Sequence, residues 1–288
     1  MIMNRLFAVL LSGCLMATSA HAQPQTHVCA ALAQRLAQSP VLLEGRLLNE
    51  ALFEASALDC GDIAAGVMAK GASLEARNRS GKTALSIAAA RGARTVAQML
   101  IAAGADVNHR DLAGSTPLLE AAGSGRRRMA AMLAEAGADP NAANKQGITP
   151  LMAAAFEGDA RTVSLLLEAR AEVGHRDAQG KGAIIYAAAR AYAGIVEQLI
   201  EAGADADGIW GNGLTPLMWA AGHANDAPSA DAIKVAEILL EAGAGISRRD
   251  NRGRDALMIA AERGHGEMVA FLLARGADAK ARDNAGMR

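Results

Sequence analysis

Residues 144–176 read "NKQGITPLMAAAFEGDARTVSLLLEARAEVGHR", and this stretch carries the signals that decide the fold. The tripeptide "KQG" is typical of a turn. Thr149 followed by Pro150 is typical of a helix start, because threonine can cap the first turn and proline lacks only an N–H that would be unpaired there. The small apolar residues that follow predict one short helix, which Gly158 ends. The apolar positions within 163–167 predict a second helix.

This pattern recurs along the chain with a step of 33 residues, which lengthens to 40 between Gly213 and Gly253. Two short antiparallel helices and a turn cannot bury their apolar faces alone, whereas stacked copies can. We therefore predict an all-α repeat solenoid. The turn glycines that mark the register are Gly81, Gly114, Gly147, Gly180, Gly213, Gly253 and Gly286.

The segments "STPLLEAA" (115–122), "ITPLMAAA" (148–155), "LTPLMWAA" (214–221), "AAGADVNHRD" (102–111) and "ARGADAKARD" (274–283) resemble the ankyrin repeat. The resemblance covers residues 45–282 and implies helix-turn-helix units with a protruding β-turn. It also implies binding of other proteins on a concave face made by the turn tips and the inner helices. The seven expected units are 45–77, 78–110, 111–143, 144–176, 177–209, 210–249 with a seven-residue insertion, and 250–282.

Three units depart from the family pattern. The fifth reads "KGAII" and lacks both the threonine and the proline at its helix start. In the fourth, Arg170 replaces the closing glycine, and we expect it to adopt a left-handed backbone at a cost of about 1 kcal/mol. In the sixth, "HANDAPS" lies between the two helices and predicts a loop, followed by a second helix that starts early at Ser229 or Asp231. This insertion is either a neutral bulge or a loop that contacts a partner.

Residues 1–22 read as a secretory signal peptide, with Arg5, an apolar stretch and an A-x-A site before Gln23. The segment is typical of a bacterial signal, and we expect export to the periplasm. A second interpretation stays open, because "LSGC" ending at Cys14 resembles a lipobox, whose cysteine would be lipidated. No later segment is long and apolar enough to predict a transmembrane span.

Residues 23–44 contain "HVCAALAQRLAQ" before Ser39-Pro40, which predicts a capping helix for the array. In an oxidising compartment, Cys29 and Cys60 are expected to form a disulfide rather than remain as two free thiols. Such a bond would close a loop of about 30 residues and contribute roughly 3–4 kcal/mol. At the other end, residues 283–288 begin an eighth turn, which either frays or covers the last helix pair.

The formal net charge of −1 gives no reason to expect binding of nucleic acid or a membrane surface. The sequence shows no phosphate-binding loop, nucleophile elbow or cluster with metal-ligand spacing. His109 and His175 occupy equivalent positions two units apart, too far to share a metal. We therefore expect no enzymatic activity, no cofactor and no metal. The methionines are expected to pack in the core.

Charged residues separate by position. The turns and inner-helix ends are rich in Lys and Arg, and the second helices are rich in Glu, so the concave face is expected to be basic. One interpretation is steering of an acidic partner, and the other is ordinary solubility. The basic positions include Arg77, Arg79, Lys82, Arg91, Arg110, Lys145, Arg176, Lys181, Arg190, Arg249, Arg252, Arg254, Arg263 and Arg282.

Aromatic residues are rare, at 3%, yet five of them fall between positions 156 and 219. Clustered aromatics near the centre of a concave surface are typical interface anchors, although they can also fill space between helices. We therefore predict a non-enzymatic, monomeric protein-binding module of the periplasm, which could stabilise or inhibit an envelope enzyme. The alternative is a lipid-anchored scaffold. The predicted partner-binding residues are Phe156, Tyr186, Arg190, Trp210, Trp219 and His223.

Overall fold

The computed structural model describes residues 23–38, 45–223 and 229–287. The predicted signal peptide with Cys14, and most of the insertion, lie outside the described residues. The helices are α1 (Gln23–Gln38), α2 (Arg46–Leu58), α3 (Gly61–Ala69), α4 (Ala84–Arg91), α5 (Arg94–Ala102), α6 (Pro117–Gly123), α7 (Arg127–Glu135), α8 (Pro150–Glu157), α9 (Ala160–Glu168), α10 (Ala183–Ala189), α11 (Ala193–Glu201), α12 (Pro216–His223), α13 (Ser229–Glu241), α14 (Ala256–Glu262) and α15 (Gly266–Ala274).

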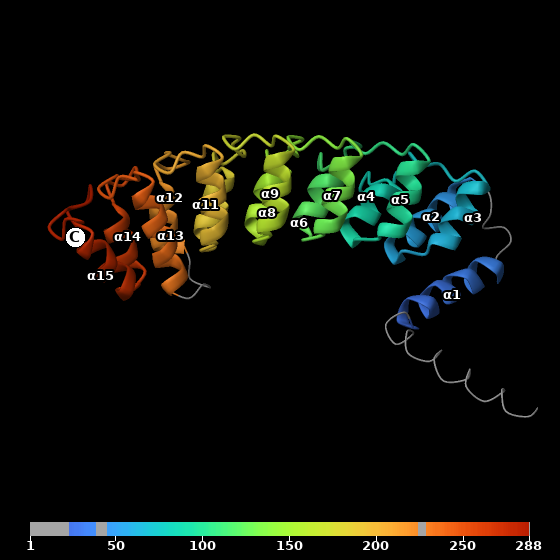
Figure 1. Ribbon diagram of the computed structural model, residues 1–288, viewed down its shortest axis with the longest axis horizontal. Helices are drawn as coiled ribbons and strands as arrows, with labels where there is room; N and C mark the ends of the chain where they lie inside the picture. Colours follow the sequence, from blue (N-terminus) through green and yellow to red (C-terminus); the bar gives the residue numbers. More distant parts are fainter. Residues whose placement is uncertain (1–22, 39–44, 224–228, 288) are drawn as a thin grey trace, which may run out of the picture.

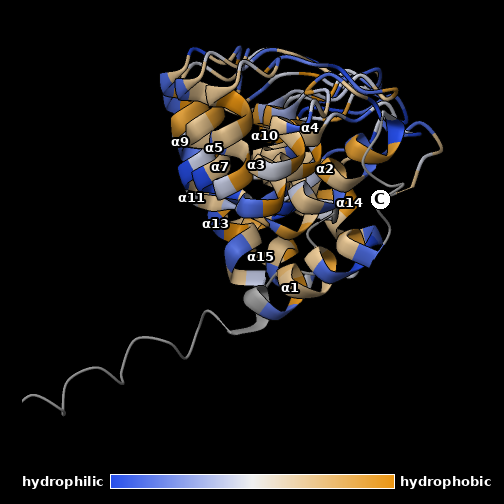
Figure 2. Cartoon of the chain, turned by 90° about the vertical axis from the view of Figure 1, so that its right-hand side faces the viewer, coloured by the Kyte–Doolittle hydropathy of each residue, from blue (hydrophilic) through white to orange (hydrophobic). Residues whose placement is uncertain are grey.

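From α2 onward the helices form antiparallel pairs that stack in chain order (Figure 1). The even-numbered helices contact one another and form the inner layer, and the odd-numbered helices from α3 form the outer layer. Figure 2, which looks along the array, shows the two layers on opposite sides and the turns together along one edge. The predicted all-α repeat solenoid is confirmed.

The inner helices begin as the sequence predicts. The hydroxyl of Thr149 accepts a hydrogen bond from the N–H of Met152 at 3.3 Å, and Pro150 is the first helical residue. The same cap forms in the second, third and sixth units. In the seventh unit a carboxylate replaces the hydroxyl, since Asp255 accepts from the N–H of Met258. Each cap satisfies an N–H that has no partner inside the helix.

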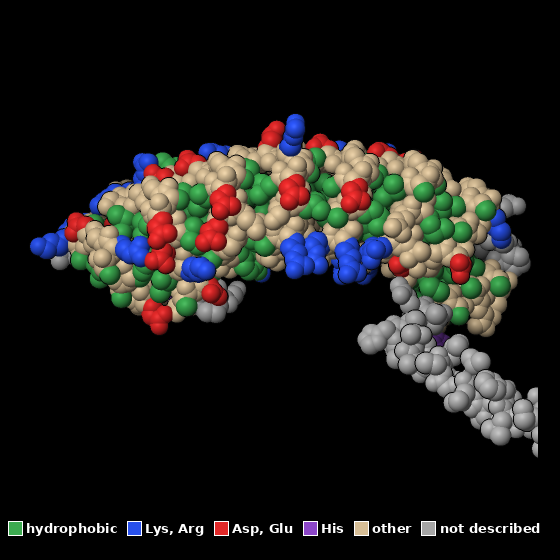
Figure 3. Space-filling model, in the orientation of Figure 1, with side chains coloured by type: hydrophobic (Ala, Val, Ile, Leu, Met, Phe, Trp, Pro, Cys, Tyr) green, Lys and Arg blue, Asp and Glu red, His purple; other side chains and the backbone are tan. Residues whose placement is uncertain are grey.

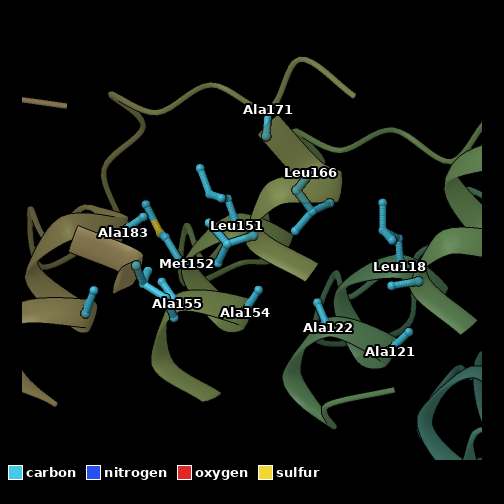
Figure 4. Packing of buried hydrophobic residues seen from close by; sticks show 14 of the residues in the cluster. Leu118, Ala121, Ala122, Leu151, Met152, Ala154, Ala155, Leu166, Ala171 and Ala183 are labelled. Carbon is cyan, nitrogen blue, oxygen red and sulfur yellow. The ribbon is translucent and has the colours of Figure 1, made fainter. Parts of the chain in front are cut away.

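The core lies between successive units and consists largely of alanine and leucine. Ala154 and Ala155 of α8 are fully buried, as are the matching pairs in the neighbouring inner helices, and their small side chains permit close packing (Figure 4). A large apolar residue at the second position of the inner helix is buried in each unit from the second onward. These residues are Leu85, Leu118, Leu151, Ile184, Leu217 and Leu257.

The turns form a second stack. In most units an Asn or Asp side chain folds the turn, as when Oδ1 of Asp111 accepts from the N–H groups of Ala113 and Ser115. Backbone bonds then join one turn to the next, for example from Lys145 N–H to the carbonyl of Ala113 at 2.9 Å. Such hydrogen bonds keep neighbouring units in register along this edge.

The first and last units are covered differently. Helix α1 ends before Ser39-Pro40 and packs on α2 through Leu32, which is 2% exposed. A disulfide joins Cys29 on α1 to Cys60, with their Cα atoms 5.5 Å apart. At the C-terminus, residues 283–287 form an eighth turn, and the N–H of Asn284 donates to the carbonyl of Arg252.

In the sixth unit, the insertion lengthens the second helix, α13. Helix α13 begins at Ser229 and has 13 residues, whereas α5, α7, α9, α11 and α15 have nine. The prediction of an early, longer second helix is therefore confirmed. The remaining extra residues fall within 224–228, outside the described residues.

In the fourth unit, Arg170 has a φ of 64°, so the predicted left-handed backbone is confirmed as well.

Within the described part of the chain, no helix combines the length and the apolar character that a membrane crossing requires.

Candidate functional site

The candidate site lies on the inner-helix face, where α8, α10 and α12 pack side by side. Tyr186 on α10 and Trp219 on α12 hold the same position in adjacent units, 33 residues apart. Both side chains are half-buried. Phe156, near the end of α8, is 43% exposed, which is high for a phenylalanine.

Lys181 lies between the two half-buried rings. Its Nζ is 4.9 Å from the centroid of the Trp219 ring and 5.9 Å from that of Tyr186. Both distances are within the range of a cation–π contact. The lysine comes from the turn that precedes α10, so the turn and the two inner helices contribute to one surface.

A second cation lies over the other aromatic residues. The guanidinium carbon of Arg190 is 4.8 Å from the Phe156 ring centroid and 5.9 Å from that of Tyr192. Phe156 also meets Tyr186 edge to face, with ring centroids 6.0 Å apart and an interplanar angle of 88°. We call Phe156, Lys181, Tyr186, Arg190, Tyr192 and Trp219 the aromatic–cation cluster.

A hydrogen bond fixes the centre of this cluster. The hydroxyl of Tyr186 donates to Oδ2 of Asp177 across 2.5 Å. Oδ1 of the same carboxylate accepts from the N–H groups of Gln179 and Lys181 at 2.8 Å each. Burial raises the pKa of Tyr186 above its usual value, and the hydrogen bond to Asp177 and the charge of that carboxylate raise it further. The ring is thus tied to the turn that carries Lys181.

Trp210 is not part of this surface, and its assignment as an exposed anchor is wrong. Its side chain is only 4% exposed. It occupies the position at which Asp177 and Asp250 fold their own turns, and its ring enters the space beneath the turn. The guanidinium carbon of Arg176 lies 4.2 Å from the ring centroid and covers it from outside.

Two glycines make room for the Trp210 ring. A Cβ added at Gly182 would lie 2.8 Å from the Trp210 ring, and one added at Gly208 would lie 2.9 Å from it. In the other units these positions carry larger residues, such as Thr149 and His175. The absence of a threonine at position 182, in the "KGAII" segment, therefore has a steric explanation, because a larger side chain there would clash with the Trp210 ring.

The structure thus brings together four of the six predicted partner-binding residues: Phe156, Tyr186, Arg190 and Trp219. The side chain of His223 lies outside the described residues. Lys181 and Tyr192 also belong to the cluster, although neither is among the predicted partner-binding residues. The sequence could have predicted that Lys181 lies near Tyr186. Lys181 is in the turn five residues before Tyr186, close to the start of the same helix.

Charge is distributed along the array as well. Figure 3 views the outer layer, where Asp and Glu side chains recur along the helices and Lys and Arg gather at the lower edge of the middle units. A groove of about 370 Å³ lies among the short connections between inner and outer helices. The run "RRR" at 126–128 marks this groove in the sequence. The groove is lined by Arg91, Arg94, Arg126, Arg127 and Arg128, with Asp159 at its border.

The chemistry of the aromatic–cation cluster suits recognition. Aromatic faces and an edge-to-face pair offer apolar contact, and the two cations offer hydrogen bonds to carboxylates. Among the ion pairs of the described residues, none includes Lys181 or Arg190. Their charges are therefore available to a partner.

Comparison with known proteins agrees with this architecture. The relatives include Ankyrin repeat domain-containing protein 63 of Homo sapiens, 45% identical over 74 residues, which are 26% of this chain and 19% of that protein. Inversin of Danio rerio is 42% identical over 66 residues, 23% of this chain and 6% of that protein. The chain therefore matches only a small part of each relative's length, and both relatives are eukaryotic.

The family model described as "Ankyrin repeats (3 copies)" matches residues 52–144, 137–208 and 184–283. Together these matches span more than half of the chain and include every inner helix of the aromatic–cation cluster. The repeat units deduced from the glycine register and seen as stacked helix pairs are thus ankyrin repeats, and the chain belongs to the ankyrin-repeat family.

Proposed function

We propose that this chain is a non-enzymatic, monomeric protein-binding module that holds a partner protein on the aromatic–cation cluster. The observation that carries the proposal is the combination of an exposed Phe156 with two cations, Lys181 and Arg190, that lie against aromatic rings. Large aromatic side chains at the centre of a repeat array are the type of residue that dominates binding energy. Ankyrin repeats are a general protein-interaction module, which fits this use.

The cations favour a partner with an acidic surface. Lys181 and Arg190 are held near aromatic faces but have no carboxylate partner in the ion pairs of the described chain. A carboxylate from a partner could reach both a cation and the adjacent apolar ring, which gives orientation as well as attraction. Nucleic acid is a less suitable partner, because the net charge of −1 gives the chain no overall attraction to a phosphate backbone.

We place this activity in the bacterial periplasm. The support comes from the signal-like residues 1–22 and from the Cys29–Cys60 disulfide, since such bonds persist in oxidising compartments. The partner would then be an envelope protein, such as an enzyme that the module stabilises or inhibits.

The test is capture of the partner from periplasmic extract by the wild-type chain, with crosslinking and identification. Phe156→Ala and Trp219→Ala should each weaken binding of the identified protein by about tenfold or more. Leu112→Ala is the matched control, because Leu112 is an apolar side chain 65% exposed on a turn of another unit. Equal binding by the wild type and both cluster variants, with folding intact, would refute the proposed site.

A second candidate function rests on the "LSGC" segment that ends at Cys14. Lipidation there would make the chain a membrane-anchored scaffold of the cell envelope. Mass spectrometry of the mature N-terminus distinguishes the two forms, since a free or cyclised Gln23 terminus excludes lipidation at Cys14.

A further inference from the structure

Three potential metal ligands meet where the first unit joins the second. Glu75, Asp106 and His109 each offer one donor atom, and these atoms all lie within 4.8 Å of one another. Histidine spacing along the sequence gave no sign of this site, because the two carboxylates join the histidine only when the units stack. The site lies apart from the aromatic–cation cluster, on the segments that lead into the turns.

His109 is held in a form that can bind a metal. The side chain is buried, with 4% exposed. Its Nε2 lies 2.8 Å from the carbonyl oxygen of Gly81. A carbonyl can only accept, so Nε2 carries the hydrogen and Nδ1 is the ring nitrogen that can bind a metal. A backbone carbonyl orients many metal-binding histidines in this way.

Among the described residues, the two carboxylates form no ion pair with Lys or Arg. Glu75 and Asp106 are exposed, and neither occurs among the ion pairs with Lys or Arg in the described chain. They are nevertheless held close, because Oε1 of Glu75 accepts a hydrogen bond from the N–H of Asp106 at 3.0 Å. Two carboxylates beside an imidazole nitrogen form a favourable environment for a cation.

We propose that Glu75, Asp106 and His109 bind a divalent transition-metal ion of the Zn²⁺ type. One imidazole nitrogen and two carboxylate oxygens suit zinc better than Mg²⁺ or Ca²⁺, which prefer oxygen ligands alone. Zinc ligands lie about 2.1 Å from the ion and so roughly 3.4 Å from one another, which requires the carboxylates to move inward by about 1 Å. Both are exposed and can do so, and solvent can supply the fourth ligand.

The repeat register provides a natural control. Asn141, Glu172 and His175 occupy the matching positions two units later, with an amide in place of the first carboxylate. Oδ1 of Asn141 accepts from the N–H of Glu172 at 2.7 Å, as Glu75 does from Asp106. The substitution Glu75→Asn should therefore preserve the backbone contact and remove the carboxylate ligand.

Isothermal titration of the tag-free, chelator-treated full chain with zinc chloride tests the site. We expect one equivalent of zinc to bind, with Glu75→Asn and His109→Gln weakening the affinity at least about tenfold and His175→Gln leaving it unchanged. Absence of saturable binding in the wild-type chain would overturn the proposal. So would wild-type affinity in Glu75→Asn, or an equal loss in His175→Gln, because either result places the ion elsewhere.

Discussion

The hydroxyl of Tyr186 donates a hydrogen bond to the carboxylate of Asp177 across 2.5 Å and so joins the inner helix of the fifth unit to its own turn. Asp177 is 7% exposed and also accepts two backbone N–H groups of that turn. The bond therefore connects an aromatic side chain of the candidate site to the group that folds the turn. It fixes the ring against which Phe156 and Lys181 pack.

Removing this hydroxyl should destabilise the fold modestly. Tyr186→Phe retains the ring and deletes one bond to a charged acceptor, so the free energy of unfolding should fall by about 1–2 kcal/mol. Tyr192→Phe is the control, because no hydrogen bond of the Tyr192 hydroxyl occurs in the described structure. Urea denaturation of both variants measures the difference, and equal stability of the two would contradict the role assigned to the bond.

Alkaline pH should act on the same group. The pKa of Tyr186 is raised by burial, by the hydrogen bond to Asp177 and by the charge of that carboxylate. The folded chain then holds the phenolic proton more tightly than the unfolded chain does, so the contribution of Tyr186 is present below about pH 10 and is lost as pH rises above it. Absorbance titration of Tyr186→Phe should lack the tyrosine that ionises at the higher pH. Loss of the earlier transition instead would contradict the raised pKa.

Much of the fold follows from the sequence because each unit repeats the same local signals. Thr149 and Pro150 predict the helix start, and the glycine register predicts the stacking, since both depend on residues close in the chain. The exposure of an individual aromatic depends on neighbouring units and is harder to predict. Trp219 and Trp210 are both tryptophans of the sixth unit, yet one is half-buried on the inner-helix face and the other is buried beneath a turn.

The burial of Trp210 could nevertheless have been predicted from the repeat register. It stands where most other units have a turn-forming Asn or Asp, and glycine occurs at both Gly182 and Gly208 in place of larger residues. Only the structure shows that these three changes meet in space. The grouping of Glu75 and Asp106 with His109 has the same origin, because its members come from two successive units.

Gly182→Thr restores the capping threonine of the second, third, fourth and sixth units but should lower stability. The new Cβ would lie 2.8 Å from the Trp210 ring, and relief of such overpacking costs about 1–3 kcal/mol. Adding Trp210→Asp removes the ring and supplies a turn-folding carboxylate, so the double variant should regain stability. A double-mutant cycle by chemical denaturation measures this coupling. Additive effects of the two substitutions would show that Gly182 is not needed to accommodate the Trp210 ring.

The junction of the fifth and sixth units should open most easily along the turn edge. Backbone hydrogen bonds join successive turns from the N–H groups of Lys145 and Ala178 to the preceding turns. At the matching position of the next turn, no bond from the N–H of Gly211 to the carbonyl of Gln179 occurs among the described hydrogen bonds. Amide exchange followed by NMR should therefore be faster at Gly211 than at the two matching amides, because an amide without a partner needs less opening to exchange. Equal protection at the three positions would contradict a weaker junction.

Arg170 offers the simplest stabilising substitution. Its φ of 64° belongs to the left-handed region, which glycine adopts without a steric penalty and arginine does not. Arg170→Gly should therefore raise the free energy of unfolding by about 1 kcal/mol, despite the greater freedom of glycine in the unfolded chain. The control is Ala169→Gly, one residue earlier at φ −77°, where glycine gains nothing and should cost up to about 1 kcal/mol. Urea denaturation measures the change in the free energy of unfolding for both variants. An increase for Arg170→Gly with a decrease for Ala169→Gly supports backbone strain at residue 170. A decrease for both would mean that the contacts of the Arg170 side chain outweigh the strain.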